Sequence, residues 1–264
     1  AVVSLLLSGL AAGVIGSKFV AESAGCPDAI TLDMGGTSCD IALVRAGKPI
    51  VASESRVGGF PLRTQMIDVN TIGAGGGSIA WLDDVGGLRV GPRSAGASPG
   101  PACYGQGGQE ATVTDASVVL GYLNPENFAA GTMALDPAAA RAAIDRLARR
   151  LGLGILETAA GIHSIVNARM ADEVRRVSIR RGHDPREFVL LPLGGAGPVH
   201  GGAIALELGI PRLLIPEVPG VLSAFGLLVA AVEHDQAETF AVAAEAVDRA
   251  KIRGVFDRLA ALGR

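Results

Sequence analysis

Residues 29–44 read AITLDMGGTSCDIALV, two apolar stretches that enclose a short loop of glycine and hydroxyl residues. Residues 29–32 and 41–44 have the composition of buried strands, and the Ala46-Gly47 turn leads into a third stretch at residues 48–57. The segment therefore predicts the order strand, glycine loop, strand, turn, strand.

The loop between the first two strands has the chemistry of a phosphate site. Gly35 and Gly36 lack a Cβ atom, so their backbone N–H groups can approach phosphate oxygens closely. Asp33 and Asp40 flank the loop, and carboxylates suit a Mg²⁺ ion held partly through water. The alternative interpretation is a tight β-turn with incidental acids.

A second glycine turn follows the apolar stretch 188–193. It contains Gly194, Gly195 and Gly197, and Pro198 is typical of the first turn of a helix that would run to Gly209. Such a helix start presents free N–H groups and the positive end of the helix dipole. The pattern predicts a site for an anion or a nucleotide.

Other stretches predict the remaining elements. We expect helices at 9–24, 137–151, 158–181 and 221–232, strands at 78–82, 87–90 and 213–215, and a loop-rich segment at 60–108. The chain starts with Ala and its last helical pattern is unfinished, so we expect it to be part of a longer protein.

Composition narrows the class of protein. The 264 residues are 49% hydrophobic, with a net charge of −3 and 4% aromatic residues, which argues against nucleic acid or an anionic membrane as the main partner. The three cysteines form no CxxC pair, which favours a reducing, cytoplasmic location. Residues 1–15 are apolar but lack a basic region, so neither a signal peptide nor a spanning helix is expected.

Several ordered motifs together resemble the A subunit of the hydantoinase and oxoprolinase family, which includes oxoprolinases and ketone carboxylase subunits. They lie at residues 8–9, 12–14, 33–40, 68–78, 100–105, 112–116, 194–200 and 223–228. Leu10 and Cys39 depart from the family pattern, which usually has proline and a hydroxyl residue there.

This resemblance implies an α/β fold: one ribonuclease-H-like half of the actin, sugar kinase and heat-shock chaperone ATPase clamp, with glycine-rich loop insertions. It implies ATP and Mg²⁺ as cofactors, with Gly194, Gly195 and Gly197 against the adenosine. Residues 1–240 would form the ATPase domain and residues 241–264 the start of a further region. The implied partners are the N-terminal half of the same chain, a B-type subunit or domain, and a small-molecule substrate.

The first hairpin would then carry the phosphate chemistry. Asp33 is the preferred ligand of a Mg²⁺-bound water, and Thr37 and Ser38 would contact the γ-phosphate. Asp40 would act as a second acid or metal ligand, or would only make a hydrogen bond at the start of its strand.

Two further groups of residues are candidates for substrate binding and catalysis. The first comprises Asp68, Asn70 and Thr71, with the glycines Gly75 and Gly76; it would bind the substrate or a second ligand, or would only form a turn.

The second group is Asp115 with His200, which would act as an acid/base pair or as ligands of an additional divalent metal. A local hydrogen bond is the alternative role for His200. Cys103 is expected to be a buried structural cysteine.

The resemblance implies ATP-dependent hydrolysis of a cyclic amide such as a hydantoin or 5-oxoproline. A ketone carboxylase subunit is the alternative within the family. A nucleotide-switched binding module of the actin or chaperone type is the alternative from another class, although the glycine-rich loops fit a substrate pocket better.

Overall fold

The computed structural model describes residues 8–52, 55–57, 60–62, 66–231, 236–243, 245 and 247–263. Contacts divide the chain into two units, Ala1–Val229 and Ala230–Arg264, and each is considered by itself. The second unit contains the helix α7 (Arg249–Leu262), which Asp248 caps by accepting a hydrogen bond from Ala250 N. The boundary expected at residue 240 stays a prediction.

The first unit is built on a six-stranded mixed sheet with the order β12-β11-β1-β2-β3, in which β8 also pairs with β2. Its strands are β1 (Ala29–Met34), β2 (Cys39–Arg45), β3 (Lys48–Pro49), β8 (Val69–Ile72), β11 (Val189–Leu193) and β12 (Arg212–Leu213). Strand β1 is antiparallel to β2 and parallel to β11. The C-terminal ends of β1 and β11 therefore lie side by side at the same end of the sheet.

Three two-stranded pairs accompany this sheet. They are β4 (Val51–Ala52) with β7 (Met66–Ile67), β5 (Ser55–Val57) with β6 (Phe60–Leu62), and β9 (Ser78–Leu82) with β10 (Leu88–Ser94). The pair β9–β10 closes through a turn in which Asp83 accepts hydrogen bonds from the backbone of Val85 and Gly87.

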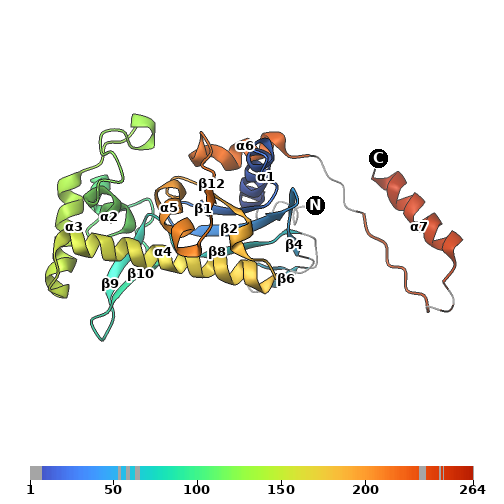
Figure 1. The fold of residues 1–264 in the computed structure, drawn as a ribbon, viewed down its shortest axis with the longest axis horizontal. Helices are drawn as coiled ribbons and strands as arrows, with labels where there is room; N and C mark the ends of the chain where they lie inside the picture. Colours follow the sequence, from blue (N-terminus) through green and yellow to red (C-terminus); the bar gives the residue numbers. More distant parts are fainter. Residues whose placement is uncertain are drawn as a thin grey trace. The chain divides into compact units, whose positions relative to one another are not determined.

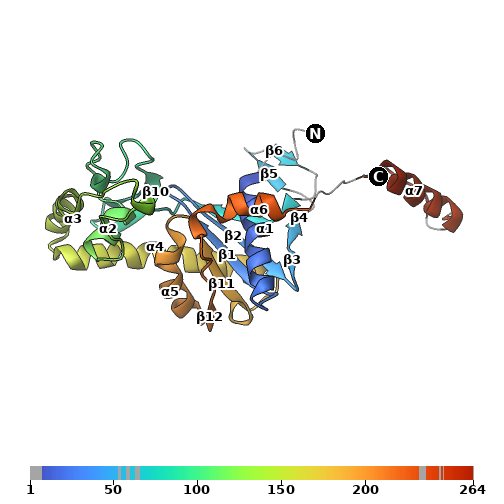
Figure 2. The same ribbon diagram turned by 90° about the horizontal axis from the view of Figure 1, so that it is seen from above.

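The first unit has helices over both faces of the sheet and further helices that pack on these. They are α1 (Ser8–Ser23), α2 (Val113–Val119), α3 (Pro137–Leu151), α4 (Ile155–Arg180), α5 (Gly197–Leu208) and α6 (Leu222–Val229). Helices α1 and α6 lie side by side over one face (Figure 2). Helix α4 crosses the other face and continues to α2, α3, β9 and β10 (Figure 1).

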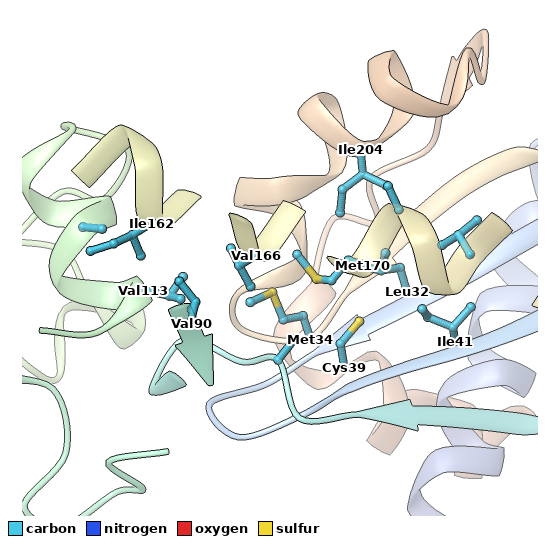
Figure 3. Close-up of a cluster of buried hydrophobic side chains, with 14 of the residues drawn as sticks. Leu32, Met34, Cys39, Ile41, Val90, Val113, Ile162, Val166, Met170 and Ile204 are labelled. Atoms are coloured by element: carbon cyan, nitrogen blue, oxygen red, sulfur yellow. The ribbon is translucent and has the colours of Figure 1, made fainter. Parts of the chain in front are cut away.

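The main core lies between the sheet and helices α4 and α5. Figure 3 shows Met34 and Cys39 from the sheet against Val166 and Met170 of α4. The same cluster continues to Val90 and Val113, so α4 joins the sheet to α2 and β10 through one buried apolar surface. A separate cluster beneath α1 and α6 contains Val14, Leu193 and Leu222.

Most of the predicted elements are confirmed. The strand at 78–82 and the helix at 137–151, with Asp136 as its N-cap and Gly152 in the left-handed conformation after it, have the predicted bounds. Helix α4 starts at Ile155 rather than 158. Strand β8 and helix α2, in contrast, were expected only as motifs, because each is short and rich in polar residues.

Within the described residues, no single helix is both long and apolar enough to cross a membrane. By length and composition alone, one pair passes this test together, α3 with α4, which are bent by 91° at their junction.

Candidate functional site

The loop between β1 and β2 is a tight hairpin whose tip is exposed. Gly35 N donates to Ser38 O across the loop at 3.1 Å. Gly36 and Thr37 lie at the exposed tip, and within the described part of the chain their N–H groups have no acceptor. Two adjacent free N–H donors are what a phosphate group requires from such a loop.

The second glycine-rich segment, residues 73–77, packs directly on this hairpin. Gly76 N donates to Gly35 O at 3.0 Å, and Gly77 N donates to Gly36 O at 2.7 Å. A Cβ atom on Gly75 would lie 2.5 Å from both Gly36 C and Thr37 N, so the backbones approach too closely for any side chain. The predicted residues Gly75 and Gly76 thus support the hairpin through their backbone.

Helix α2 is bonded to the same loop. Thr114 donates to Gly76 O through both its backbone N, at 2.7 Å, and its Oγ1, at 2.8 Å. The hairpin, the glycine-rich loop and the first turn of α2 are therefore one hydrogen-bonded assembly.

The turn after β11 lies beside the hairpin, because β1 and β11 are parallel neighbours. Ala196 N donates to Met34 O at 2.9 Å. Gly194 has φ +80°, and a Cβ atom there would lie 2.5 Å from Met34 O and closer still to Asp33 Oδ1. Gly195 is exposed, and the structure thus brings together the two glycine turns found in the sequence.

Asp33 and Asp40 are directly opposite each other on β1 and β2 and project from the same face of the sheet. Ser223 of α6 donates to Asp33 Oδ2 at 3.2 Å, and Thr71 of β8 donates to Asp40 Oδ1 at 2.5 Å. Gly13 of α1 leaves the space that this arrangement needs, since a Cβ atom there would lie 2.9 Å from Ser223 Oγ.

Both carboxyl groups hold their protons more tightly than usual. Burial raises the pKa of Asp33, the hydrogen bond from Ser223 opposes this, and the charge of Asp40 adds to the rise. Burial likewise raises the pKa of Asp40 against the effect of Thr71. Two neighbouring acids whose charged forms are disfavoured by burial are a suitable place for a divalent cation.

The described residues contain no group of three His, Cys, Asp or Glu side chains arranged to hold a metal ion. A cation at Asp33 and Asp40 would therefore need further oxygen ligands from water or from a bound phosphate, which is common for Mg²⁺.

The cluster of Asp68, Asn70 and Thr71 expected from the sequence does not form. Alternation along β8 puts Thr71 on the face of Asp40 and Asn70 on the opposite face. Asp68 precedes the strand and makes an ion pair with Arg181, just beyond the end of α4. Of the three, only Thr71 lies at the carboxylate pair.

Asp115 and His200 do not form the expected pair either. Asp115 is fully buried at the start of α2 and accepts from Ala102 N, Cys103 N and both the N and Oγ1 of Thr112. Its carboxylate closes a capping box, so its hydrogen-bonding capacity is used in holding the chain. Cys103 is also fully buried, and burial raises the pKa of its thiol, which agrees with a structural role.

His200 instead belongs to a network that sequence analysis missed. Its Nδ1 lies 2.7 Å from Asn167 Oδ1, and its ring stacks on His163 with centroids 4.5 Å apart. His163 Nε2 lies 2.8 Å from Ser117 Oγ. The available signal was the spacing of His163 and Asn167, four residues apart on one helix face; their partners on α2 and α5 come from the tertiary fold.

A cavity of about 110 Å³ lies between the hairpin and this network. Its lining includes the glycines Gly35, Gly36, Gly76 and Gly195, the largely apolar side chains of Tyr104, Leu123 and Phe128, and the ring of His200. The cavity therefore combines backbone groups, suited to phosphate oxygens, with surface suited to hydrocarbon.

The chain is similar to several known proteins. The model of the family described as hydantoinase/oxoprolinase matches residues 1–236. The alpha subunit of caprolactamase from Pseudomonas jessenii is 45% identical over 90% of this chain and 34% of its own length. The acetophenone carboxylase gamma subunit of Aromatoleum aromaticum is 40% identical over 86% of this chain and 31% of its own.

A crystal structure of the ATP-dependent caprolactamase from Pseudomonas jessenii matches with a TM-score of 0.81 and 41% identity, over 96% of this chain and 37% of that one. The predicted α/β ATPase-type fold with glycine-rich loops is confirmed. The chain spans about a third of the length of the relatives it matches. It belongs to the hydantoinase/oxoprolinase family.

Proposed function

We propose that this chain is the phosphate-holding part of an ATP-dependent enzyme that hydrolyses a small cyclic amide. The observation that carries the proposal is the meeting of two glycine turns at one carboxylate pair, Asp33 and Asp40. The similarity to an ATP-dependent caprolactamase supports the amide as substrate class.

The residues of the hairpin fit the groups that this reaction needs. Gly36 and Thr37 would donate backbone hydrogen bonds to phosphate oxygens, and the Thr37 and Ser38 hydroxyls would add to them. Asp33 would hold a Mg²⁺-bound water, with Asp40 as the second carboxylate. ATP would supply the phosphoryl group that activates the carbonyl carbon of the amide toward water, and Mg²⁺ would neutralise phosphate charge.

The turn at Gly194, Gly195 and Gly197 would face the nucleoside. Its position beside Met34 supports this role, because a nucleotide whose phosphates lie on the hairpin extends past the adjacent parallel strand. A B-type subunit or domain and the N-terminal half of the ATPase clamp would complete the active enzyme, and the cytoplasm is its proposed location.

A ketone carboxylase subunit is the second candidate. The 40% identity with the acetophenone carboxylase gamma subunit favours it, since activating a ketone oxygen would use the same hairpin. A nucleotide-switched binding module is less well supported, because the glycine-rich loop at residues 73–77 packs on the hairpin and borders a cavity.

The test uses the full-length protein with its B-type partner. We expect Mg²⁺-ATP to bind in calorimetric titration, cyclic amides to stimulate ATP hydrolysis, and Asp33→Asn to abolish both while it keeps the shape and the contact with Ser223. Asp145→Asn, which changes only an exposed pair with Arg149, is the matched control. Unchanged nucleotide binding by Asp33→Asn would show that the hairpin is structural.

A further inference from the structure

The hydrogen bonds around His200 fix which of its ring nitrogens carries the proton. Asn167 Oδ1 can only accept, so Nδ1 of His200 is the donor in the 2.7 Å contact. In the neutral ring, Nε2 then has a lone pair and no proton. Within the described residues no group donates to Nε2, although the residue is only 1% exposed.

The neighbouring histidine has the opposite tautomer. Ser117 Oγ donates its one proton to Val113 O at 2.9 Å, so it accepts from Nε2 of His163. Burial lowers the pKa of His163 to about 4, and burial together with His163 lowers the pKa of His200 to about 3. Both rings are therefore neutral near pH 7, and His200 presents an acceptor.

The cavity beside His200 has the lining for a small, mostly apolar molecule. Its 110 Å³ is less than the roughly 150 Å³ of an apolar cavity that admits benzene, so the molecule would have to be smaller than benzene or the lining would have to move. Tyr104, Leu123 and Phe128 would contact the hydrocarbon part of such a molecule, and its polar part would lie near Gly36.

We propose that Nε2 of His200 accepts a hydrogen bond from the N–H group of a small cyclic secondary amide bound in this cavity. This bond would orient the ring so that the carbonyl oxygen points toward the phosphate hairpin. The inference rests on the proposed function and deepens it, because it selects between the two substrate classes.

The selection follows from hydrogen-bond chemistry. A lactam or hydantoin has an N–H donor next to its carbonyl group, whereas a ketone has only C–H groups there. A ketone in the cavity would displace water from Nε2 without offering a donor in its place, and an acceptor left unsatisfied in this way costs free energy. His200 is thus a residue that determines specificity for amides.

The experiment compares a lactam with the cycloalkanone of the same ring size, in which CH₂ replaces N–H. Affinities are measured by calorimetry on the full-length protein with its partner and a non-hydrolysable Mg²⁺-ATP analogue. We expect the wild type to bind the lactam about tenfold more tightly than the ketone, the size expected of one net hydrogen bond.

Substitutions then test the assignment. His200→Phe, which keeps a ring against His163 but has no acceptor, is expected to bring the ratio of the two affinities close to one. His200→Gln, whose Oε1 can accept, is expected to retain most of the preference. His163→Phe is expected to change both affinities equally, and His183→Phe, which lies outside the network, to change neither.

The outcomes separate the inference from the proposed function. If the wild type hydrolyses ATP in response to cyclic amides and the His200→Phe variant still prefers the lactam, the inference alone is overturned. A wild type that binds no lactam, or that prefers the ketone, overturns both the inference and the amide assignment.

Discussion

At the residue scale, the candidate site depends on places where a side chain would not fit. Gly194 is the clearest, because it has φ +80° and faces both Met34 O and the Asp33 carboxylate. Its neighbour Gly195 is in the same turn, yet a Cβ atom there would meet nothing within 4 Å. The two glycines therefore provide a matched pair of substitutions.

Gly194→Ala is expected to lower the free energy of unfolding by about 2 kcal/mol or more, from the left-handed backbone and the contact with Met34 O. It should also weaken nucleotide binding, because Asp33 must move. Gly195→Ala is expected to change stability by less than about 1 kcal/mol. Urea unfolding and calorimetric titration measure both effects, and equal losses in the two variants would contradict the assignment.

A second prediction at this scale concerns the protonation of Asp33. The Ser223 hydroxyl holds down a pKa that burial raises, so Ser223→Ala should raise that pKa further. Since a cation binds the ionised carboxylate, the pH at which Mg²⁺-ATP binding is half lost should move upward.

Titrations of nucleotide affinity between pH 4 and 8 would measure the shift, with Ser23→Ala as the control. Ser23 is exposed, and its hydroxyl group donates to the backbone oxygen of Phe19. If Ser223→Ala and Ser23→Ala lose binding at the same pH, Asp33 is not the group that titrates.

At the scale of elements, helix α2 depends on the hydrogen bonds of one buried carboxylate. The Asp115 carboxylate accepts four hydrogen bonds and joins the start of α2 to the backbone of Ala102 and Cys103. The same helix holds the glycine-rich loop through Thr114 and Gly76. Removal of the Asp115 carboxylate should therefore destabilise the start of α2 and, through Thr114 and Gly76, the loop that packs on the hairpin.

Asp115→Ala is expected to lower the free energy of unfolding by about 3 kcal/mol, because it leaves several buried donors without an acceptor. Asp136→Ala removes an exposed cap of α3 and should cost about 1 kcal/mol. Chemical denaturation compares the two. A fully stable Asp115→Ala protein that has lost ATP hydrolysis would instead favour a catalytic role.

At the scale of the whole molecule, the stacked histidines make stability depend on pH. Their folded-state pKa values of about 4 and about 3 lie below the ordinary value of 6.5, so between pH 6.5 and 4 the unfolded chain binds more protons. The contribution of the two histidines to the free energy of unfolding is therefore complete above pH 6.5 and is lost as the pH falls toward 4. Asp33 and Asp40, whose pKa values are raised, act in the opposite direction.

The contribution of the pair is isolated by comparison with the double variant His163→Phe/His200→Phe. From pH 6 to pH 5 the free energy of unfolding of the wild type should fall by up to about 2.7 kcal/mol more than that of the double variant. This is the change expected over one pH unit when the unfolded chain binds two more protons than the folded chain. Urea unfolding at both pH values measures the difference, and parallel curves for the two proteins would contradict it. The variant His183→Phe should behave as the wild type.

Much of the fold could be predicted from the sequence because its signals are local. Short apolar runs and turn chemistry predict β1, β2 and β9, and caps such as Asp136 and Gly152 predict the limits of α3. The two glycine turns could be found in the same way, because each follows a buried apolar strand directly in the sequence.

The sequence by itself determined most of the elements, the family and the hairpin with its flanking acids. Only the tertiary structure decided which polar residues meet there. Strand pairing put Thr71 on Asp40 and turned Asn70 to the opposite face, and the loop at Ala102 and Cys103 took up the remaining hydrogen-bonding capacity of Asp115. His200 contacts His163 and Asn167 only because α4 packs on α5. Local patterns fix backbone conformation, whereas side-chain partners depend on which elements come together across long stretches of chain.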